Sequence, residues 1–224
     1  MGLGIGGKVK MKKQASNDSG WRGSPDLWLE AASAILLESG VEAVKIAALA
    51  KKLKLSRTSF YWFFRDREEL LDALVQRWKE KNTGSIVKQS QAYADSPAEA
   101  TLNVFDCWLD QSLFDSRFEF AMRSWALQSK EMLDEVQLAD KQRLEALYNM
   151  FKRYGFDDIA ADVHSRTIYL VQIGYISMQS DESIELRMKR IPEYVKTFTG
   201  EYPKENELQR FYFRHGYTET SGGR

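Results

Sequence analysis

The stretch that decides the fold runs from Ile46 to Leu71 and reads IAALAKKLKLSRTSFYWFFRDREELL. Its apolar residues recur every three or four positions, which is the period of helices that bury one face. The pattern breaks at Lys54-Leu55-Ser56 and again before Asp66. It therefore predicts two short helices joined by a tight turn, followed by a helix that Asp66 caps, with Glu69 as its capping-box partner.

The flanking sequence braces this pair of short helices on both sides. Ser24-Pro25 predicts a helix start, because serine caps helices and proline is favoured at the first helical position, and Gly40 predicts the end of that helix. Apolar residues from Leu70 to Trp78 continue the later helix. Two short helices held between two longer ones form a helix-turn-helix unit, whose second short helix fits the major groove of DNA.

The rest of the chain is also predicted to be helical. Apolar residues at helical spacing indicate a helix that starts at Ser96-Pro97, and further helices at about 117–129, 131–154, 157–179 and 183–198. No alternation of period two persists. We therefore predict an all-α protein, with a three-helix helix-turn-helix domain at the N-terminal end and a helical domain after it.

Charge is distributed unevenly along a chain whose net charge is zero. Residues 1–81 hold 15 Lys and Arg against 10 Asp and Glu, and the stretch from Lys45 to Arg67 holds seven bases and one acid. A local basic face on a neutral chain is typical of a module that binds phosphate groups. A solvated charged face has the same composition, and both interpretations stay open at this point.

The Ile46–Leu71 stretch resembles the TetR family of bacterial repressors. The family pattern has a Val-Ser turn, a Tyr-x-His-Phe end to the recognition helix, and then a basic residue followed by Glu and Leu. The corresponding residues here are Leu55-Ser56, Tyr61-Trp62-Phe63-Phe64 and Arg67-Glu68-Glu69-Leu70. The chain departs from the pattern at Lys45 in place of threonine, Lys54 in place of the turn glycine, and Phe63 in place of histidine.

The resemblance implies which residues meet DNA. Tyr61 and Arg67 match phosphate contacts, Trp62 lies where it can cover the sugar-phosphate backbone, and Phe60 and Phe64 are expected in the core. The predicted DNA-binding residues are Lys45, Ser56, Arg57, Thr58, Ser59, Tyr61, Trp62 and Arg67.

The resemblance also implies a domain plan and partners. The plan is a flexible basic arm (1–23), a helix-turn-helix DNA-binding domain (24–68), a helical effector-binding and dimerisation domain (69–198) and an unassigned tail (199–224). A homodimer is expected through the helices at about 131–154 and 157–179, and it would bind a palindromic operator as a repressor. Release by a small apolar or aromatic effector is expected, with candidate pocket residues Phe105, Trp108, Phe118, Trp125 and Tyr169, for each of which core packing is the alternative.

Several other classes of protein are not indicated. The chain has no secretory signal pattern, no apolar run long enough for a membrane span, and a single cysteine, Cys107, so we expect a cytoplasmic protein with no membrane partner. No catalytic, phosphate-loop or metal-ligand motif is present, so we expect no enzyme activity, no cofactor and no metal. The alternatives are a regulator without an effector, a helical protein-interaction module, or an enzyme that keeps the head as scaffold.

Overall fold

The computed structural model describes residues 22–218. These residues hold eleven α-helices, one 3₁₀ turn, one π-helical turn and no strand, which confirms the all-α prediction. The elements are α1 (Pro25–Ser39), η1 (Val41–Ala43), α2 (Ile46–Leu53), α3 (Arg57–Phe60), α4 (Arg67–Trp78), η2 (Lys79–Thr83), α5 (Gly84–Gln91), α6 (Pro97–Leu109), α7 (Ser116–Ala126), α8 (Lys130–Arg153), α9 (Asp158–Ser177), α10 (Ile184–Thr199) and α11 (Glu205–Arg214). Except for Arg22 and Gly23, the predicted arm at 1–23 lies outside this range.

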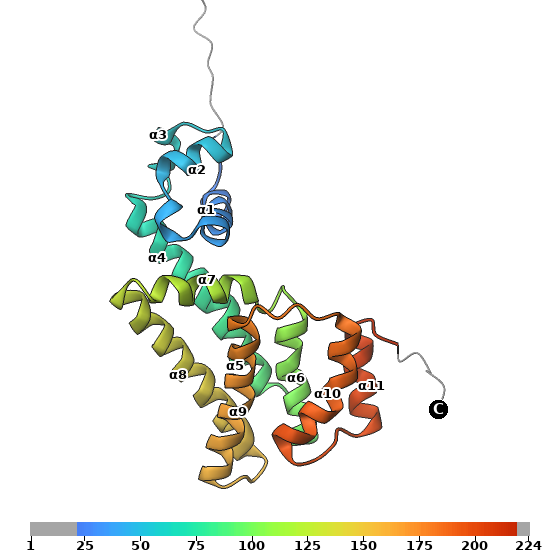
Figure 1. Cartoon of the computed structure of the whole chain (residues 1–224). Helices are drawn as coiled ribbons and strands as arrows, with labels where there is room; N and C mark the ends of the chain where they lie inside the picture. Colours follow the sequence, from blue (N-terminus) through green and yellow to red (C-terminus); the bar gives the residue numbers. More distant parts are fainter. Residues whose placement is uncertain (1–21, 219–224) are drawn as a thin grey trace, which may run out of the picture.

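The helices form two parts, which we call the head (α1–α3 with η1) and the body (α5–α11), and α4 runs from one into the other (Figure 1). In the body, α8 packs along α9, and both α10 and α11 pack on α6. Within the body, the helix α7 lies next to the head, and it contacts α1 and α4 as well as α8 and α9. Among the described residues, no helix is both long and apolar enough to span a bilayer.

Side-chain caps fix where the helices begin, as the sequence predicts. The Ser24 hydroxyl accepts a hydrogen bond from the Leu27 amide at 3.2 Å, and the Asp66 carboxylate accepts one from the Glu69 amide at 2.9 Å. Ser96 and Asp157 cap α6 and α9 in the same way, at 3.0 and 2.8 Å. Each cap satisfies an amide that the first helical turn leaves unpaired.

The helix that leaves the head continues further than its predicted core positions, which end at Trp78. The π-helical turn η2 joins α4 to α5 without a break, and it buries the side chains of Asn82 and Thr83. A π-helical turn inserts one extra residue into a helix, and such turns are frequent at functional sites. Here the turn aims two polar side chains into the body.

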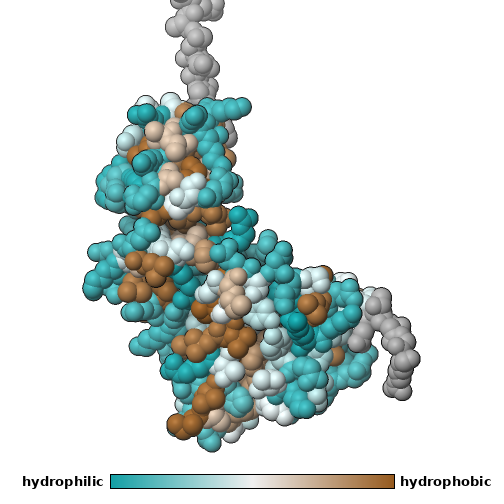
Figure 2. All heavy atoms as spheres, viewed as in Figure 1, coloured by the Kyte–Doolittle hydropathy of each residue, from teal (hydrophilic) through white to brown (hydrophobic). Residues whose placement is uncertain are grey.

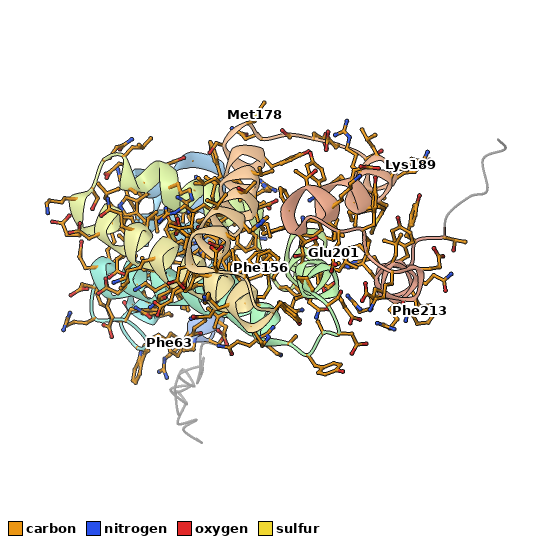
Figure 3. All side chains as sticks on the ribbon, turned by 90° about the horizontal axis from the view of Figure 1, so that it is seen from below. Phe63, Phe156, Met178, Lys189, Glu201 and Phe213 are labelled. Carbon is orange, nitrogen blue, oxygen red and sulfur yellow. The ribbon has the colours of Figure 1, made fainter. Side chains whose placement is uncertain are left out.

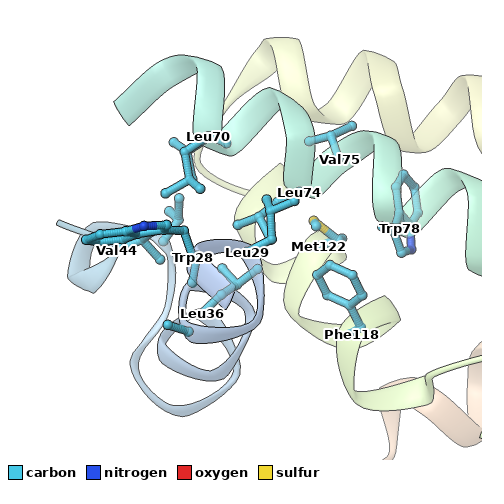
Figure 4. Packing of buried hydrophobic residues seen from close by; sticks show 14 of the residues in the cluster. Trp28, Leu29, Leu36, Val44, Leu70, Leu74, Val75, Trp78, Phe118 and Met122 are labelled. Atoms are coloured by element: carbon cyan, nitrogen blue, oxygen red, sulfur yellow. The ribbon is translucent and has the colours of Figure 1, made fainter. Parts of the chain in front are cut away.

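One hydrophobic cluster connects the head to the body across α4. Figure 4 shows Trp28 and Leu36 of α1, Leu70 and Leu74 of α4, and Phe118 of α7 packed in this cluster. This core continues past residue 68, where the sequence predicts the boundary between the DNA-binding domain (24–68) and the effector-binding and dimerisation domain (69–198). The boundary therefore stays a prediction.

The predicted unassigned tail contains a helix. In α11, the Glu207 carboxylate accepts a hydrogen bond from Ser96 at 2.8 Å. Beyond the helix end, the ring nitrogen Nε2 of His215 lies 2.7 Å from the Asp106 carboxylate. The buried side of this helix includes the charged residue Glu207 beside Phe211 and Tyr212. Because the cap residue of α6 bonds to Glu207, the buried side is not purely apolar, and the sequence pattern did not predict the helix.

Candidate nucleic-acid interface

The turn between α2 and α3 forms with a lysine where the resemblance leads one to expect glycine. Lys54 adopts the left-handed conformation, with φ 55° and ψ 36°. Its amide bonds to the Lys51 carbonyl at 3.2 Å, and the Leu55 amide bonds to the Ala50 carbonyl at 2.9 Å. A residue with a Cβ pays about 1 kcal/mol or more in this conformation, so the turn is formed under strain.

The short helix α3 is held by its cap and by its aromatic underside. The Ser56 hydroxyl accepts from the Ser59 amide at 3.2 Å. Phe60 is fully buried and meets the Trp28 ring edge to face, with centroids 5.4 Å apart, and Phe64 is also buried. The prediction that Phe60 and Phe64 belong to the core is confirmed, and their packing fixes which side of α3 faces outward.

The outward side of α3 carries most of the predicted contact residues. Tyr61 and Trp62 are 58% and 62% exposed, although large aromatic side chains usually bury most of their surface. Arg57 and Lys45 are also exposed, and neither forms an ion pair with a described residue. Ser56 and Thr58 are exposed on the same short helix. Exposed aromatic rings, hydroxyls and cations on and around a short helix are suited to meet phosphates and base edges.

Two predicted contact residues, Ser59 and Arg67, form hydrogen bonds within the head. Ser59 is buried, and its hydroxyl lies 2.9 Å from that of Ser56. The Arg67 guanidinium donates to the carbonyls of Val44 at 2.6 Å and Val41 at 2.8 Å. Arg67 thus ties the start of α4 to η1, so its donors already have partners within the head.

One residue near this surface was missed by the sequence reasoning. The Arg22 guanidinium stacks over the Trp62 ring, 4.0 Å from its centroid, and the Arg22 carbonyl accepts from the Trp28 indole at 3.4 Å. A cation over a tryptophan face is attracted by the ring quadrupole. The basic composition of the N-terminal arm was the available signal, but composition cannot say which base reaches which ring.

The five candidate pocket residues separate into three environments. Phe105 and Trp108 line a small cavity of about 50 Å³ between α6, α9 and α10. Trp125 lines a much larger cleft of about 760 Å³ between the head and the body. Phe118 and Tyr169 line neither and are buried, and the Tyr169 hydroxyl donates to the Asp140 carboxylate at 2.6 Å. The structure therefore does not bring the five together in one pocket.

A family model matches the head and the start of α4. Residues 29–74 match the bacterial regulatory proteins of the tetR family. The matched range includes the turn, α3 and the exposed residues beside it. A comparison of the chain with curated proteins gives no significant match.

Solved structures share the fold over most of the chain. A transcriptional regulator from Aquifex aeolicus VF5 has 15% identity and a TM-score of 0.60, covering 78% of this chain and 99% of its own. The repressor of the Stenotrophomonas maltophilia multidrug efflux pump SmeDEF has 19% identity and a TM-score of 0.57, covering 83% and 93%. A transcriptional regulator from Rhodococcus sp. Rha1 has 16% identity and a TM-score of 0.54, covering 86% and 97%. At these identities the likeness shows the fold alone.

Proposed function

We propose that this chain, whose residues 29–74 belong to the tetR family of bacterial regulatory proteins, is a sequence-specific DNA-binding transcriptional regulator. The observation that carries the proposal is the exposed surface of Arg57, Thr58, Tyr61 and Trp62 on a helix-turn-helix unit. Phosphate contacts position such a helix, and contacts to base edges give it sequence preference. The first base-reading candidates are Arg57 and Thr58, and the first backbone candidates are Tyr61, Trp62 and Lys45.

Arg22 extends this proposed contact surface, and Ser59 and Arg67 are left out of it. Arg22 and Trp62 lie face to face, so both can approach the same phosphate strand. Ser59 is buried, and Arg67 donates to the carbonyls of Val41 in η1 and Val44 directly after it. We assign these two residues to the support of the recognition helix.

We propose that the regulator acts as a homodimer that places two heads on a palindrome. Exposed apolar residues follow one face of α9: Ile159, Val163 and Leu170 are 76%, 53% and 59% exposed. Gly174 lies on the same face, and a Cβ added there would meet nothing within 4 Å. Figure 2 shows hydrophobic side chains along the course of α9 on the visible surface. A face of this kind suits a second copy of the same helix.

This proposal narrows the predicted interface, which also included the helix at 131–154. The exposed apolar residues of α8 are Leu133 and Leu138, at 41% and 47%. They lie five positions apart, so they point in different directions around the helix. The dimer face that we propose is therefore built mainly on α9.

Repression released by a small molecule is the regulatory part of the proposal. A ligand can release DNA only if it binds the low-affinity shape better than the DNA-bound shape, by about 10⁴-fold for a complete switch. The cleft between head and body offers space for such a ligand next to α1.

The test is a selection of binding sites from randomised duplex DNA with the full chain, followed by affinity measurements at several salt concentrations. We expect a palindrome whose half-sites lie about 34–36 Å apart, or a multiple of that spacing. A reporter behind the selected site then gives the sign of control. Recovery of no duplex above non-specific affinity would reject DNA recognition and favour the alternative of a helical protein-interaction module.

A further inference from the structure

A large hollow among the described residues lies between the head and the body. Its volume is about 760 Å³, and it is lined by the end of α1 with η1, by α7, by the end of α9 and by Arg187 of α10. Drug-sized ligands occupy pockets of about 300–1,000 Å³, so the size is suitable. Apolar side chains on both sides, including Leu37 of the head with Phe120 and Trp125 of the body, can pack against a flat or branched apolar group.

The head side of this cleft is connected to the start of α4. Gly40, Val41 and Glu42 line the cleft, and the Val41 carbonyl accepts a hydrogen bond from Arg67 at 2.8 Å. A molecule lodged between η1 and α7 therefore contacts the segment that the first residue of α4 holds in place. The cleft gives a ligand direct mechanical access to the head, without a relay through the body core.

One charge in the cleft is half-buried and has no hydrogen-bonded partner. The Arg187 guanidinium makes no hydrogen bond or ion pair with any described residue. Burial lowers the pKa of this guanidinium. The nearby Glu182 carboxylate interacts electrostatically with Arg187, but its Oε1 is bonded to Arg190, and its Oε2 is buried without a hydrogen-bond partner among the described residues. A cation taken partly out of water without a hydrogen-bonded counter-ion favours binding of an anion.

Arg187 also lies where the two hollows meet. Gln172, Tyr175, Glu182 and Arg187 line both the large cleft and the small cavity between α6, α9 and α10. The small cavity adds Trp108, whose indole nitrogen is buried without a hydrogen-bond partner among the described residues. The other charges of the large cleft, Arg117, Glu42 and Asp181, are exposed at its rim, where water screens them.

We infer that the head–body cleft binds an amphipathic organic anion, with its carboxylate on Arg187 and its apolar part between α1 and α7. This inference rests on the proposed regulatory function, since it names the chemical class of the effector and the place where it acts. A guanidinium is suited to hold a carboxylate with two parallel hydrogen bonds. Occupation of the cleft changes the distance between η1 and α7, and so the position of the recognition helix.

Matched probes test the anion preference directly. The full chain is titrated with 2-naphthoate, 2-naphthamide and 2-naphthylmethylamine, and with octanoate, octanamide and octylamine, which keep the skeleton and change the charge. We expect the carboxylate of at least one skeleton to bind more tightly than its amide and amine. At about 100 times its dissociation constant it should raise Tm by about 5–10 °C.

Variants of two arginines test which side chain causes the preference for the carboxylate over the amide. Arg187→Gln should weaken carboxylate binding by about 10- to 100-fold and remove the preference over the amide. Arg117→Gln, which changes an exposed arginine of the same cleft, should keep the preference. Arg187→Met is a second uncharged variant in case the glutamine chain does not fold. Equal binding of amide and carboxylate, no binding by any probe, or a preference that survives in both Arg187 variants would overturn the inference.

Measurements of DNA binding distinguish a failure of this inference from a failure of the proposed function. The bound carboxylate should lower the affinity of the wild-type chain for its selected duplex and leave that of Arg187→Gln unchanged, with equal affinities in the absence of probe. If no duplex is selected but carboxylate binding depends on Arg187, the proposed DNA-binding function is wrong and the proposed anion site in the cleft is supported. If the duplex binds and carboxylate has no effect on it, the cleft has no regulatory role.

Discussion

The carboxylate of Glu119 and the guanidinium of Arg143 form a two-pronged ion pair in the interior, at 2.7 and 3.0 Å, and both side chains are shielded completely from solvent. The Trp78 indole donates to the same carboxylate at 2.7 Å and the Asn82 amide at 3.0 Å. The Tyr169 hydroxyl accepts from Arg143 at 2.9 Å. This buried polar cluster therefore joins α4 and η2 to α7, α8 and α9, the helices that hold the head against the body.

Removal of one partner of this pair should destabilise the chain strongly. Glu119→Gln leaves the buried Arg143 charge with only Asp140, 3.9 Å away and shared with Arg123, as a counter-ion, and loss of one partner of a buried pair costs about 3–5 kcal/mol. Urea unfolding should show that loss, while Glu145→Gln, an exposed change on α8, should stay within about 0.5 kcal/mol of the wild type. The double variant Glu119→Leu/Arg143→Met should recover part of the loss. A deficit below about 1 kcal/mol for Glu119→Gln would show that the pair contributes little.

The same pair predicts a specific dependence on pH. Burial alone would raise the pKa of Glu119, but Arg143 and Arg123 outweigh it and lower the pKa from 4.5 to about 2. A lowered pKa stabilises the fold above about pH 4.5, and the contribution, about 3 kcal/mol, is lost as pH falls toward 2. The difference in unfolding free energy between wild type and Glu119→Gln should therefore shrink from pH 6 to pH 3. A difference that stays constant over that interval would contradict the assignment.

The strained turn predicts a stabilising substitution. Lys54→Gly removes the Cβ that opposes the left-handed conformation at φ 55°, and should raise the unfolding free energy by about 1 kcal/mol. Lys51→Gly, inside α2, removes the same charge but should lower it by about 1 kcal/mol. Thermal unfolding of both variants gives the comparison, and equal effects in the two would mean that Lys54 carries no strain.

Local rules predicted the helices because their causes are local. Ser24, Asp66, Ser96 and Asp157 cap helices through their own following amides, and apolar periodicity marked Phe60 as core. The exposed residues of α3 were expected from the resemblance, and Ser59 among them is buried.

Hydrogen bonds and ion pairs between residues far apart in the sequence could not be predicted from the pattern of apolar residues and helix caps. The sequence pattern does not show that Arg67 bonds to the carbonyls of Val41 and Val44, 26 and 23 residues away. Glu119 and Arg143 appear in the sequence as ordinary charged residues, although each satisfies the other in the interior. The helix α11 was missed for the same reason, because Glu207 finds its partner more than a hundred residues earlier.

Arg57 and Arg67 should differ in what their loss affects. Arg57→Ala should weaken binding to the selected duplex by about 10- to 100-fold and relax its sequence preference, with unchanged Tm. Arg67→Ala should lower Tm by several degrees, because the carbonyls of Val41 and Val44 lose their donor, and the salt dependence of DNA binding should remain as in wild type. Lys88→Ala, exposed on α5, is the control for both. A shallower salt slope in Arg67→Ala would restore Arg67 to the phosphate contacts.

The proposed dimer face on α9 predicts which substitutions prevent dimerisation. Val163→Glu and Leu170→Glu place like charges opposite each other across a two-fold axis, so the double variant should be a monomer in sedimentation velocity. Phe213→Glu is the control, because Phe213 is 87% exposed on α11 and projects at the edge of the molecule away from α9 (Figure 3). The monomer should keep wild-type affinity for a single half-site and lose the gain from the second one. If the double variant remains a dimer, the interface lies elsewhere, and the orientation of the two heads on the palindrome must be derived from that other face.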